Sequence, residues 1–240
     1  MTGPILLQGA MDVETDRTAE RLTDRREETI AGFRFWQGRY AGLDLVVSRT
    51  EVGTVSAAAA TALGIQRFSP GLVLNQGTAG AHRPDLRVGD IVVGRTCVDL
   101  HSTLLPKRGA GEGMDPAAWT LWDFDADTPP AALEGDPCWA ERFETAPYDG
   151  GRVLPGRLGT GDVFNREHDR ILWLRERAGE DCEDMESLAA YRVCRRFAVP
   201  CLGLRIISNN ELTGEPYRRE VGEDLQDFLL SVLAHLGDQP

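Results

Sequence analysis

No apolar run in this sequence is long enough to cross a bilayer. The first residues, MTGPILLQGAMDVE, also lack the basic segment and the longer apolar segment of a secretory signal. We therefore expect a cytoplasmic chain without a signal peptide or a membrane-spanning segment.

Cysteine is scarce, and no two cysteines form a C-x-x-C pair. The pattern indicates neither a zinc site nor a disulfide framework, so we expect buried, reduced thiols. The five cysteines, odd in number and scattered, are Cys97, Cys138, Cys182, Cys194 and Cys201. No other cluster of metal ligands is evident, and we expect neither a metal nor a cofactor.

Positive charge is also in short supply. The chain has 26 Lys and Arg against 38 Asp and Glu, which gives a formal net charge of -12. Such an acidic chain is not expected to bind nucleic acid or anionic membrane non-specifically, although local basic patches remain compatible with it.

The 240 residues suit one large α/β domain or two small ones, and 42% of them are hydrophobic. Strand and helix patterns alternate, which favours a sheet covered by helices on both faces. We expect helices over residues 13–28, 55–64, 166–179, 187–199 and 222–236. We expect strands over residues 4–11, 71–81, 89–100, 156–164 and 201–208, and a hairpin over 33–50.

Residues 102–150 are rich in Gly, Pro, Asp and Trp and show weak periodicity. They predict a long, variable excursion from a single domain spanning residues 1–240, with a short helix near DPAAWTLW. Loops of this length in compact domains tend to be functional.

Several predicted strands end in short polar or glycine-bearing clusters. These are GAMDVE, NQGTAG, GTGDVF, DMES and RIISNN. In α/β folds, ligands bind at the carboxyl ends of the strands. Neighbouring strands with such ends would line one shared pocket.

These clusters, together with EVGTVSAAAA and VGDIVV, occur in the order seen in the nucleoside phosphorylase/nucleosidase superfamily. The chain most resembles the 5′-methylthioadenosine/S-adenosylhomocysteine nucleosidases, from roughly Ile5 to Leu236. The resemblance implies a three-layer α/β/α sandwich with a central mixed, twisted sheet. It also implies hydrolysis of the N-glycosidic bond of a purine nucleoside, and a homodimer.

The resemblance gives the acids of DMES a role. It implies that Glu186 holds the ribose hydroxyls, with Met185 packing under the sugar. An anion there would stabilise the positive charge of an oxocarbenium-like transition state. From the residues alone, a helix-capping cluster in which Asp184 or Glu186 meets free amides is the simpler interpretation.

The second acid is Glu14, which the resemblance identifies as the general base that takes a proton from water. Asp12 lies close by, at a position that carries no chemistry in the family. Without the resemblance, both acids would be interpreted as the acidic first turn of a helix.

Other motif positions complete the implied pocket. Thr78 replaces a Ser that contacts the nucleophile or sugar in relatives, and Gly77 and Gly80 would let the backbone approach the ligand. Val52 would lie near the sugar and its 5′-substituent, and Ser208 would contact the substrate. Phe164 would stack on the purine. The plainer alternatives are an ordinary glycine turn and a core Phe.

Two positions depart from the family patterns. Asn75 stands where many phosphorylases place an Arg for phosphate, which favours water as the nucleophile. Asn209 stands where adenine-specific nucleosidases carry an Asp that protonates purine N7. An Asn amide cannot act as a general acid but can donate to N7 and accept elsewhere.

Asn209 therefore hints at a 6-oxopurine nucleoside such as inosine, guanosine or futalosine, with Glu211 as a substitute acid. For futalosine, Lys107 and Arg108 could meet a 5′-side carboxylate, although a solvated basic turn explains them equally. Phosphate-dependent cleavage and a nucleoside-binding protein without catalysis remain as alternatives.

Overall fold

The computed structural model describes residues 3–237. Its main sheet has ten strands, and a separate two-stranded sheet lies outside it. The main sheet contains β1 (Ile5–Gly9), β2 (Thr23–Ile30), β3 (Phe33–Tyr40), β4 (Leu43–Arg49), β5 (Leu72–Ala81), β6 (Ile91–Asp99), β9 (Leu133–Glu134), β10 (Val153–Thr160), β11 (Cys182–Asp184) and β12 (Cys201–Asn209). The helices are α1 (Asp16–Glu20), α2 (Thr54–Phe68), α3 (Pro137–Glu144), α4 (His168–Ala178), α5 (Ser187–Phe197) and α6 (Val221–Gly237).

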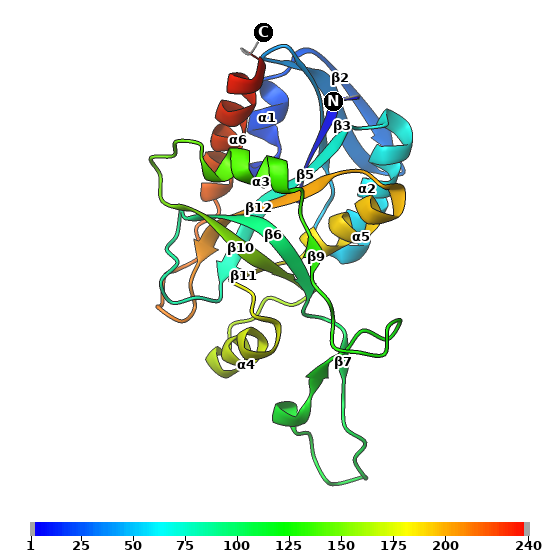
Figure 1. Ribbon diagram of the computed structural model, residues 1–240, viewed down its shortest axis with the longest axis vertical. Coiled ribbons are helices and arrows are strands. Elements are labelled where there is room, and N and C mark those ends of the chain that lie inside the picture. The colour runs from blue at the N-terminus through cyan, green and yellow to red at the C-terminus, as the bar shows by residue number, and fades with distance from the viewer. Residues whose placement is uncertain (1–2, 238–240) are drawn as a thin grey trace.

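Helices cover both faces of the sheet, so the predicted three-layer α/β/α sandwich is confirmed (Figure 1). Alternate residues of a strand point to opposite faces. Ile5 and Leu7 of β1 accordingly enter one core with α1, α3 and α6, whereas Leu6 enters the other core with α2 and α5. None of the helices among residues 3–237 is long and apolar enough to cross a membrane.

The sheet is mixed and partly closes on itself. Its strand order is β11-β10-β6-β12-β5-β1-β4-β3-β2, and β11 also pairs with β5. The three-residue strand β11 runs parallel to β10 and antiparallel to β5, which places Glu183 opposite Gly80. Sequence inspection missed β11 because three residues are too short to show a period.

The helix expected over residues 13–28 is wrong. A short 3-10 turn (Asp12–Glu14) and α1 are followed by β2, which pairs with β3. The Arg and Glu residues that looked helical lie on the exposed edge strand, where charges discourage pairing with other chains.

Helix α2 continues past Gly64, the end expected from sequence, to Phe68. A Cβ added at Gly64 would lie 2.8 Å from Leu6 Cδ2, so glycine here permits close packing of helix on sheet. The helix ends at Ser69, whose left-handed φ of 48° breaks the helical path.

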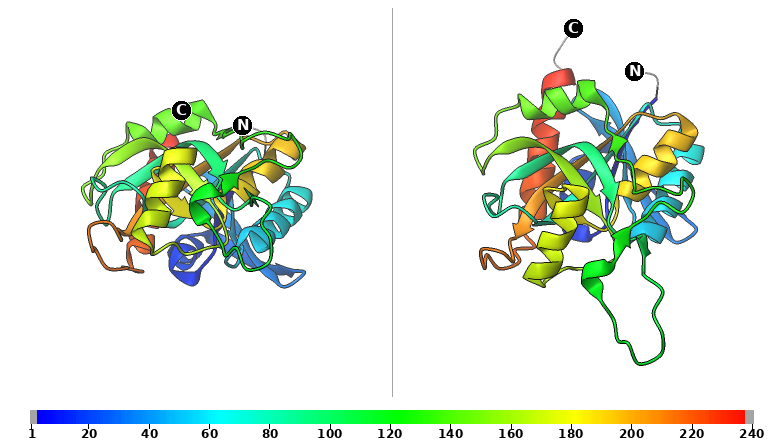
Figure 2. Two further views of the ribbon diagram at one scale, coloured as in Figure 1. Left: turned by 90° about the horizontal axis from the view of Figure 1, so that it is seen from below. Right: turned by 60° about the horizontal axis from the view of Figure 1, so that its bottom comes forward.

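The excursion contains more regular structure than its composition indicated. It holds the hairpin of β7 (Thr103–Leu104) and β8 (Thr120–Leu121), then β9 and α3. The short helix expected near DPAAWTLW is one 3-10 turn, Pro116–Ala118. The hairpin of β7 and β8 with its connecting loop, here called the arm, projects from the end of the molecule opposite the termini, whereas α3 packs near α6 (Figure 1, Figure 2).

The basic turn of the arm is tied within its own loop. Arg108 pairs with Asp115 at 3.0 Å and donates to the Glu112 carbonyl, an arrangement that supports a solvated turn. Four of the five free cysteines are buried as expected, but Cys138 is exposed, so the expectation of a buried thiol is wrong at that position.

Candidate active site

A pocket of about 360 Å³ lies at the carboxyl ends of β1, β5 and β12, beside β11. Every site residue predicted from sequence lines it, with the exception of Asn209. The full lining is Ala10, Met11, Glu14, Val52, Thr78, Ala79, Gly80, Val163, Phe164, Glu183, Asp184, Met185, Glu186, Ser208 and Tyr217. The shared pocket expected from the strand ends is therefore present.

Asn209 lies directly behind this lining. Its side chain is buried, and its Nδ2 lies 3.3 Å from Glu211 Oε1. A Cβ added at Gly80 would be 3.6 Å from both the Nδ2 and the Oδ1 of Asn209. The amide therefore lies beside Gly80, which itself lines the pocket.

Glu14 is almost fully buried, and four donors hold its carboxylate. Oε2 accepts from the backbone N–H groups of Ala10 (2.8 Å) and Met11 (3.0 Å). Oε1 accepts from the N–H (2.8 Å) and the hydroxyl (3.0 Å) of Thr78. A group that accepts four hydrogen bonds and donates none behaves as a carboxylate, the form that a general base requires.

Gly9 and Gly77 have no side chain, and this provides the space that the Glu14 side chain occupies. A Cβ added at Gly77 would lie 2.9 Å from Glu14 Oε1, and one added at Gly9 would lie 2.8 Å from Glu14 Cβ. Real Cβ atoms essentially never stand this close to another heavy atom. Glycine at both positions therefore fixes the approach of β1 and β5 to the acid.

The two acids of DMES take different roles: Asp184 caps a helix, and Glu186 enters the pocket. Asp184 Oδ1 accepts from the backbone N–H groups of Glu186 and Ser187, both at 2.8 Å, and so caps the start of α5. Glu186 instead turns into the pocket, where its Oε1 accepts from Gly53 N–H at 3.0 Å. Capping and a pocket acid are both present, on different residues.

Arg205 is a fully buried cation behind these acids. Its Nε lies 3.2 Å from Asp184 Oδ2, and its guanidinium lies 4.0 Å from Glu186 Oε2. Asn75 completes the arrangement, since its Oδ1 and its carbonyl accept from Arg205 at 2.6 and 3.0 Å. Asn75 thus orients Arg205 within the sheet.

The environment of Glu186 favours its neutral form. Burial raises the pKa of its carboxyl to about 8, and the negative charges of Asp184 and Glu14 act in the same direction. Arg205 and the Gly53 N–H lower the pKa and only partly offset burial. Glu186 is therefore poised to change charge near neutral pH.

Sequence reasoning missed two lining residues that bear on the chemistry. Tyr217 follows β12, and burial together with the nearby Glu14 charge raises the pKa of its phenol. Nothing in its local sequence marks it. Glu183 belongs to the acidic stretch CEDMES, but no pattern in the sequence places it in the pocket. Its position opposite Gly80 depends on strand β11, which was not predicted.

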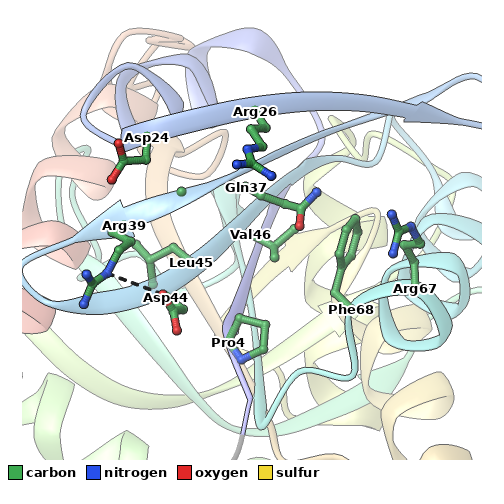
Figure 3. Close-up of a pocket in the computed structure, with 11 residues that line it drawn as sticks. Pro4, Asp24, Arg26, Gln37, Arg39, Asp44, Leu45, Val46, Arg67 and Phe68 are labelled. Atoms are coloured by element: carbon green, nitrogen blue, oxygen red, sulfur yellow. Dashed lines mark ion pairs between the residues drawn. The ribbon is translucent and has the colours of Figure 1, made fainter.

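A second hollow, of about 470 Å³, lies over the outer strands β2, β3 and β4 near the end of α2 (Figure 3). None of the predicted site residues lines it. Its Arg39 pairs with Asp44 at 3.5 Å, and its Arg67 pairs with Glu28 at 3.1 Å. Arg39 and Arg67 are therefore paired with nearby acids, and Arg26 is a third arginine in the lining. The first pocket, which the predicted site residues line, is the candidate active site.

Comparisons with known proteins agree with this geometry. A sequence model of the Phosphorylase superfamily matches residues 4–235. The 5′-methylthioadenosine/S-adenosylhomocysteine nucleosidase of Geobacillus thermodenitrificans (strain NG80-2) is 31% identical over 228 residues, covering 95% of this chain and 90% of that protein.

Solved structures share the fold across nearly the whole chain. The nucleosidase of the same name from Colwellia psychrerythraea 34H, in complex with adenine, has a TM-score of 0.79 at 26% identity, covering 98% of this chain and 96% of that one. A futalosine hydrolase mutant of Helicobacter pylori strain 26695 also has a TM-score of 0.79, at 23% identity, covering 98% and 100%. At that identity the second likeness concerns the fold alone. The chain belongs to the phosphorylase superfamily, in the branch of the 5′-methylthioadenosine/S-adenosylhomocysteine nucleosidases.

Proposed function

We propose that this protein hydrolyses the N-glycosidic bond of a purine nucleoside, with water as the nucleophile. The observation that carries the proposal is the charge of the pocket. Among the residues of the described chain that line it, four are carboxylic acids and none is Lys, Arg or His. Such a lining repels phosphate but suits water and a sugar that develops positive charge.

Glu14 acts as the base in this proposal. The water replaces the Thr78 hydroxyl as a donor to Glu14 Oε1 and gives its proton to the carboxylate while the water oxygen bonds to C1′. The C1′–N9 bond breaks with both electrons leaving on the purine. Glu186 holds the ribose hydroxyls, and its negative form stabilises the oxocarbenium-like transition state. Thr78, which already contacts Glu14, and Ser208 lie where they can orient the sugar or the water.

We assign the purine to the part of the pocket that Phe164 and Val163 line. Phe164 and Val163 are each 51% exposed and line the pocket, so they offer apolar surface for a flat heterocycle. Met185 and Val52 supply apolar surface for the sugar and its 5′-substituent. Asn209 would donate a hydrogen bond to the departing purine, whose proton then comes from solvent.

The resemblance implies a homodimer, and we include this in the proposal. Exposed apolar side chains support it, because Val52 at the pocket and Val55 on the first turn of α2 are 51% and 81% exposed. A second copy packed against them would narrow the mouth of the pocket.

The proposal is tested by following base release from inosine and from 5′-methylthioadenosine in parallel, in phosphate-free buffer. Release of free ribose or methylthioribose at a rate unchanged by added phosphate is the expected result. Strict phosphate dependence with a sugar-1-phosphate product would establish phosphorolysis instead. Saturable binding of nucleosides without turnover of any of them would establish a binding protein.

The pKa of Glu186 predicts a pH profile. The free enzyme carries the protonated acid below about pH 8, and only the ionised form stabilises the transition state. We therefore expect kcat/KM to rise about tenfold per pH unit up to about pH 8 and then to level off. A Glu186→Gln variant should be much slower and lack this rise. A wild-type profile that is flat from pH 6 to 9 would contradict the assignment.

A further inference from the structure

The segment between β12 and α6 is a tight loop that brings Tyr217 back to the pocket. Asn210 and Glu215 exchange two backbone hydrogen bonds, both at 3.0 Å, which close the loop on itself. The Arg218 N–H then donates to the Ser208 carbonyl at 2.8 Å and ties the end of the loop to β12. Ser208 lines the pocket, and Tyr217, next to Arg218, lines it as well.

The first turn of α6 packs against the side chains of Glu14 and Thr78. A Cβ added at Gly222 would lie 3.4 Å from both Glu14 Cγ and Thr78 Cγ2. The Thr78 methyl group therefore faces α6, while its Oγ1 lies 3.0 Å from Glu14 Oε1. Because a β-branched side chain held on both sides keeps one rotamer, the Thr78 hydroxyl stays beside the acid. It does so in the pocket that Tyr217 also lines.

Tyr217 brings a neutral phenol to the Thr78 hydroxyl. Burial raises the pKa of the phenol, and the negative charge of Glu14 acts in the same direction. Hydrogen bonding with the Thr78 side chain lowers this pKa, but the net shift is upward. The phenol therefore keeps its proton at neutral pH, and its oxygen retains lone pairs that accept hydrogen bonds. Tyr217 is 46% exposed, so its own O–H can turn to solvent.

The hydrogen of the Thr78 hydroxyl decides how a water is held at Glu14. A hydroxyl donates one hydrogen bond, and Thr78 gives its hydrogen to Glu14 Oε1. A water that replaces it as the donor to Oε1 carries a second hydrogen, for which the neighbouring Thr78 oxygen is an acceptor. Thr78 can accept that hydrogen only when its own hydrogen turns to a different acceptor. The Tyr217 oxygen is an acceptor within reach of it.

We propose that Tyr217 is a positioning residue for the nucleophilic water, because its oxygen accepts the Thr78 hydroxyl hydrogen once water has displaced that hydroxyl from Glu14. The water then donates one hydrogen to Glu14 and one to Thr78, which leaves a lone pair of its oxygen directed at C1′. As the bond from water to C1′ forms, Glu14 takes the proton, and the C1′–N9 electron pair leaves on the purine. Thr78 and Tyr217 exchange no proton in this step. The inference rests on the proposed function and adds a positioning residue to it.

A double-mutant cycle on Tyr217→Phe and Thr78→Val tests this role. Phenylalanine keeps the ring and removes only the oxygen, and valine keeps the branched shape of threonine. The rate constant of base release is measured in single turnovers, on whichever of inosine and 5′-methylthioadenosine the wild type cleaves faster. We expect Tyr217→Phe to slow release about 10-fold with KM changed by less than about twofold, because the lost contact orients the water and not the nucleoside. The double variant should be no slower than Thr78→Val alone, since Tyr217 acts through the Thr78 hydroxyl.

Tyr40→Phe is the matched control, because Tyr40 lies on β3 and does not line the pocket. It should leave the rate unchanged, and thermal unfolding of each variant checks that the fold is kept. A wild-type rate in Tyr217→Phe, a loss mainly in KM, or losses that multiply in the double variant would each overturn the inference while leaving the nucleosidase intact. A wild type that releases no base from either nucleoside would overturn the proposed function, and the inference with it.

Discussion

A Glu14→Gln variant is expected to lose about 10²–10⁴-fold in kcat while keeping its fold and its affinity for substrate. Glutamine has the same shape, and its oxygen can keep the two hydrogen bonds on one side. Its NH2 group meets donors on the other side, so we expect a moderate loss of stability with the fold retained. It cannot take a proton from water, and the chemical step therefore slows. The measurement is base release under single-turnover conditions, with thermal unfolding and substrate binding recorded on the same preparation.

Asp12→Asn supplies the control for this prediction. Asp12 is an acid two residues away whose side chain is 50% exposed, and it contacts Arg219 rather than the pocket. The change should leave kcat within a few-fold of wild type. Near-normal turnover in Glu14→Gln would show that another group activates the water, and the role of Glu14 as the base would then be wrong.

Replacing Arg205 with leucine should lower the free energy of unfolding by about 3–5 kcal/mol. The guanidinium is 1% exposed and compensates Asp184, whose side chain is fully buried, and Glu186. Its removal leaves the buried Asp184 carboxylate without its cation, and it leaves the Asn75 side-chain oxygen without its donor. Urea unfolding followed by tryptophan fluorescence measures the loss.

Arg39→Leu is the comparison for the effect on stability. Arg39 also forms an ion pair, with Asp44, but the two side chains are 58% and 75% exposed. Exposed pairs contribute at most about 1 kcal/mol, so the change should be small. A loss below about 1 kcal/mol in Arg205→Leu would mean that the acids do not depend on this cation.

The order of strand ends made much of the site predictable. The clusters at strand ends predicted a shared pocket, because parallel strands bring their carboxyl ends to one edge of a sheet. The family resemblance then singled out Glu14, Thr78 and Glu186 among the residues of those clusters. Those residues indeed line one pocket. The alternation of strands and helices likewise predicted the layers, since it reports on which faces are buried.

What escaped prediction depends on contacts between distant segments. The acidic stretch of β2 matches a helix by composition, and only its pairing with β3 makes it a strand. Gly64 resembles a helix end unless the proximity of Leu6 is known. Glu183 and Asn209 meet at Gly80 because of strand register, which no local pattern encodes.

The crowding around Glu14 has a consequence for how this lineage can change. Gly9 and Gly77 cannot acquire even a methyl group while the acid stays in place, since the added atom would overlap it. These three positions are therefore mutationally coupled, and neither glycine is free to drift alone. A descendant that gave up the acid would release both glycines from this constraint. Larger residues at the two positions would then mark proteins of this fold that have abandoned hydrolysis.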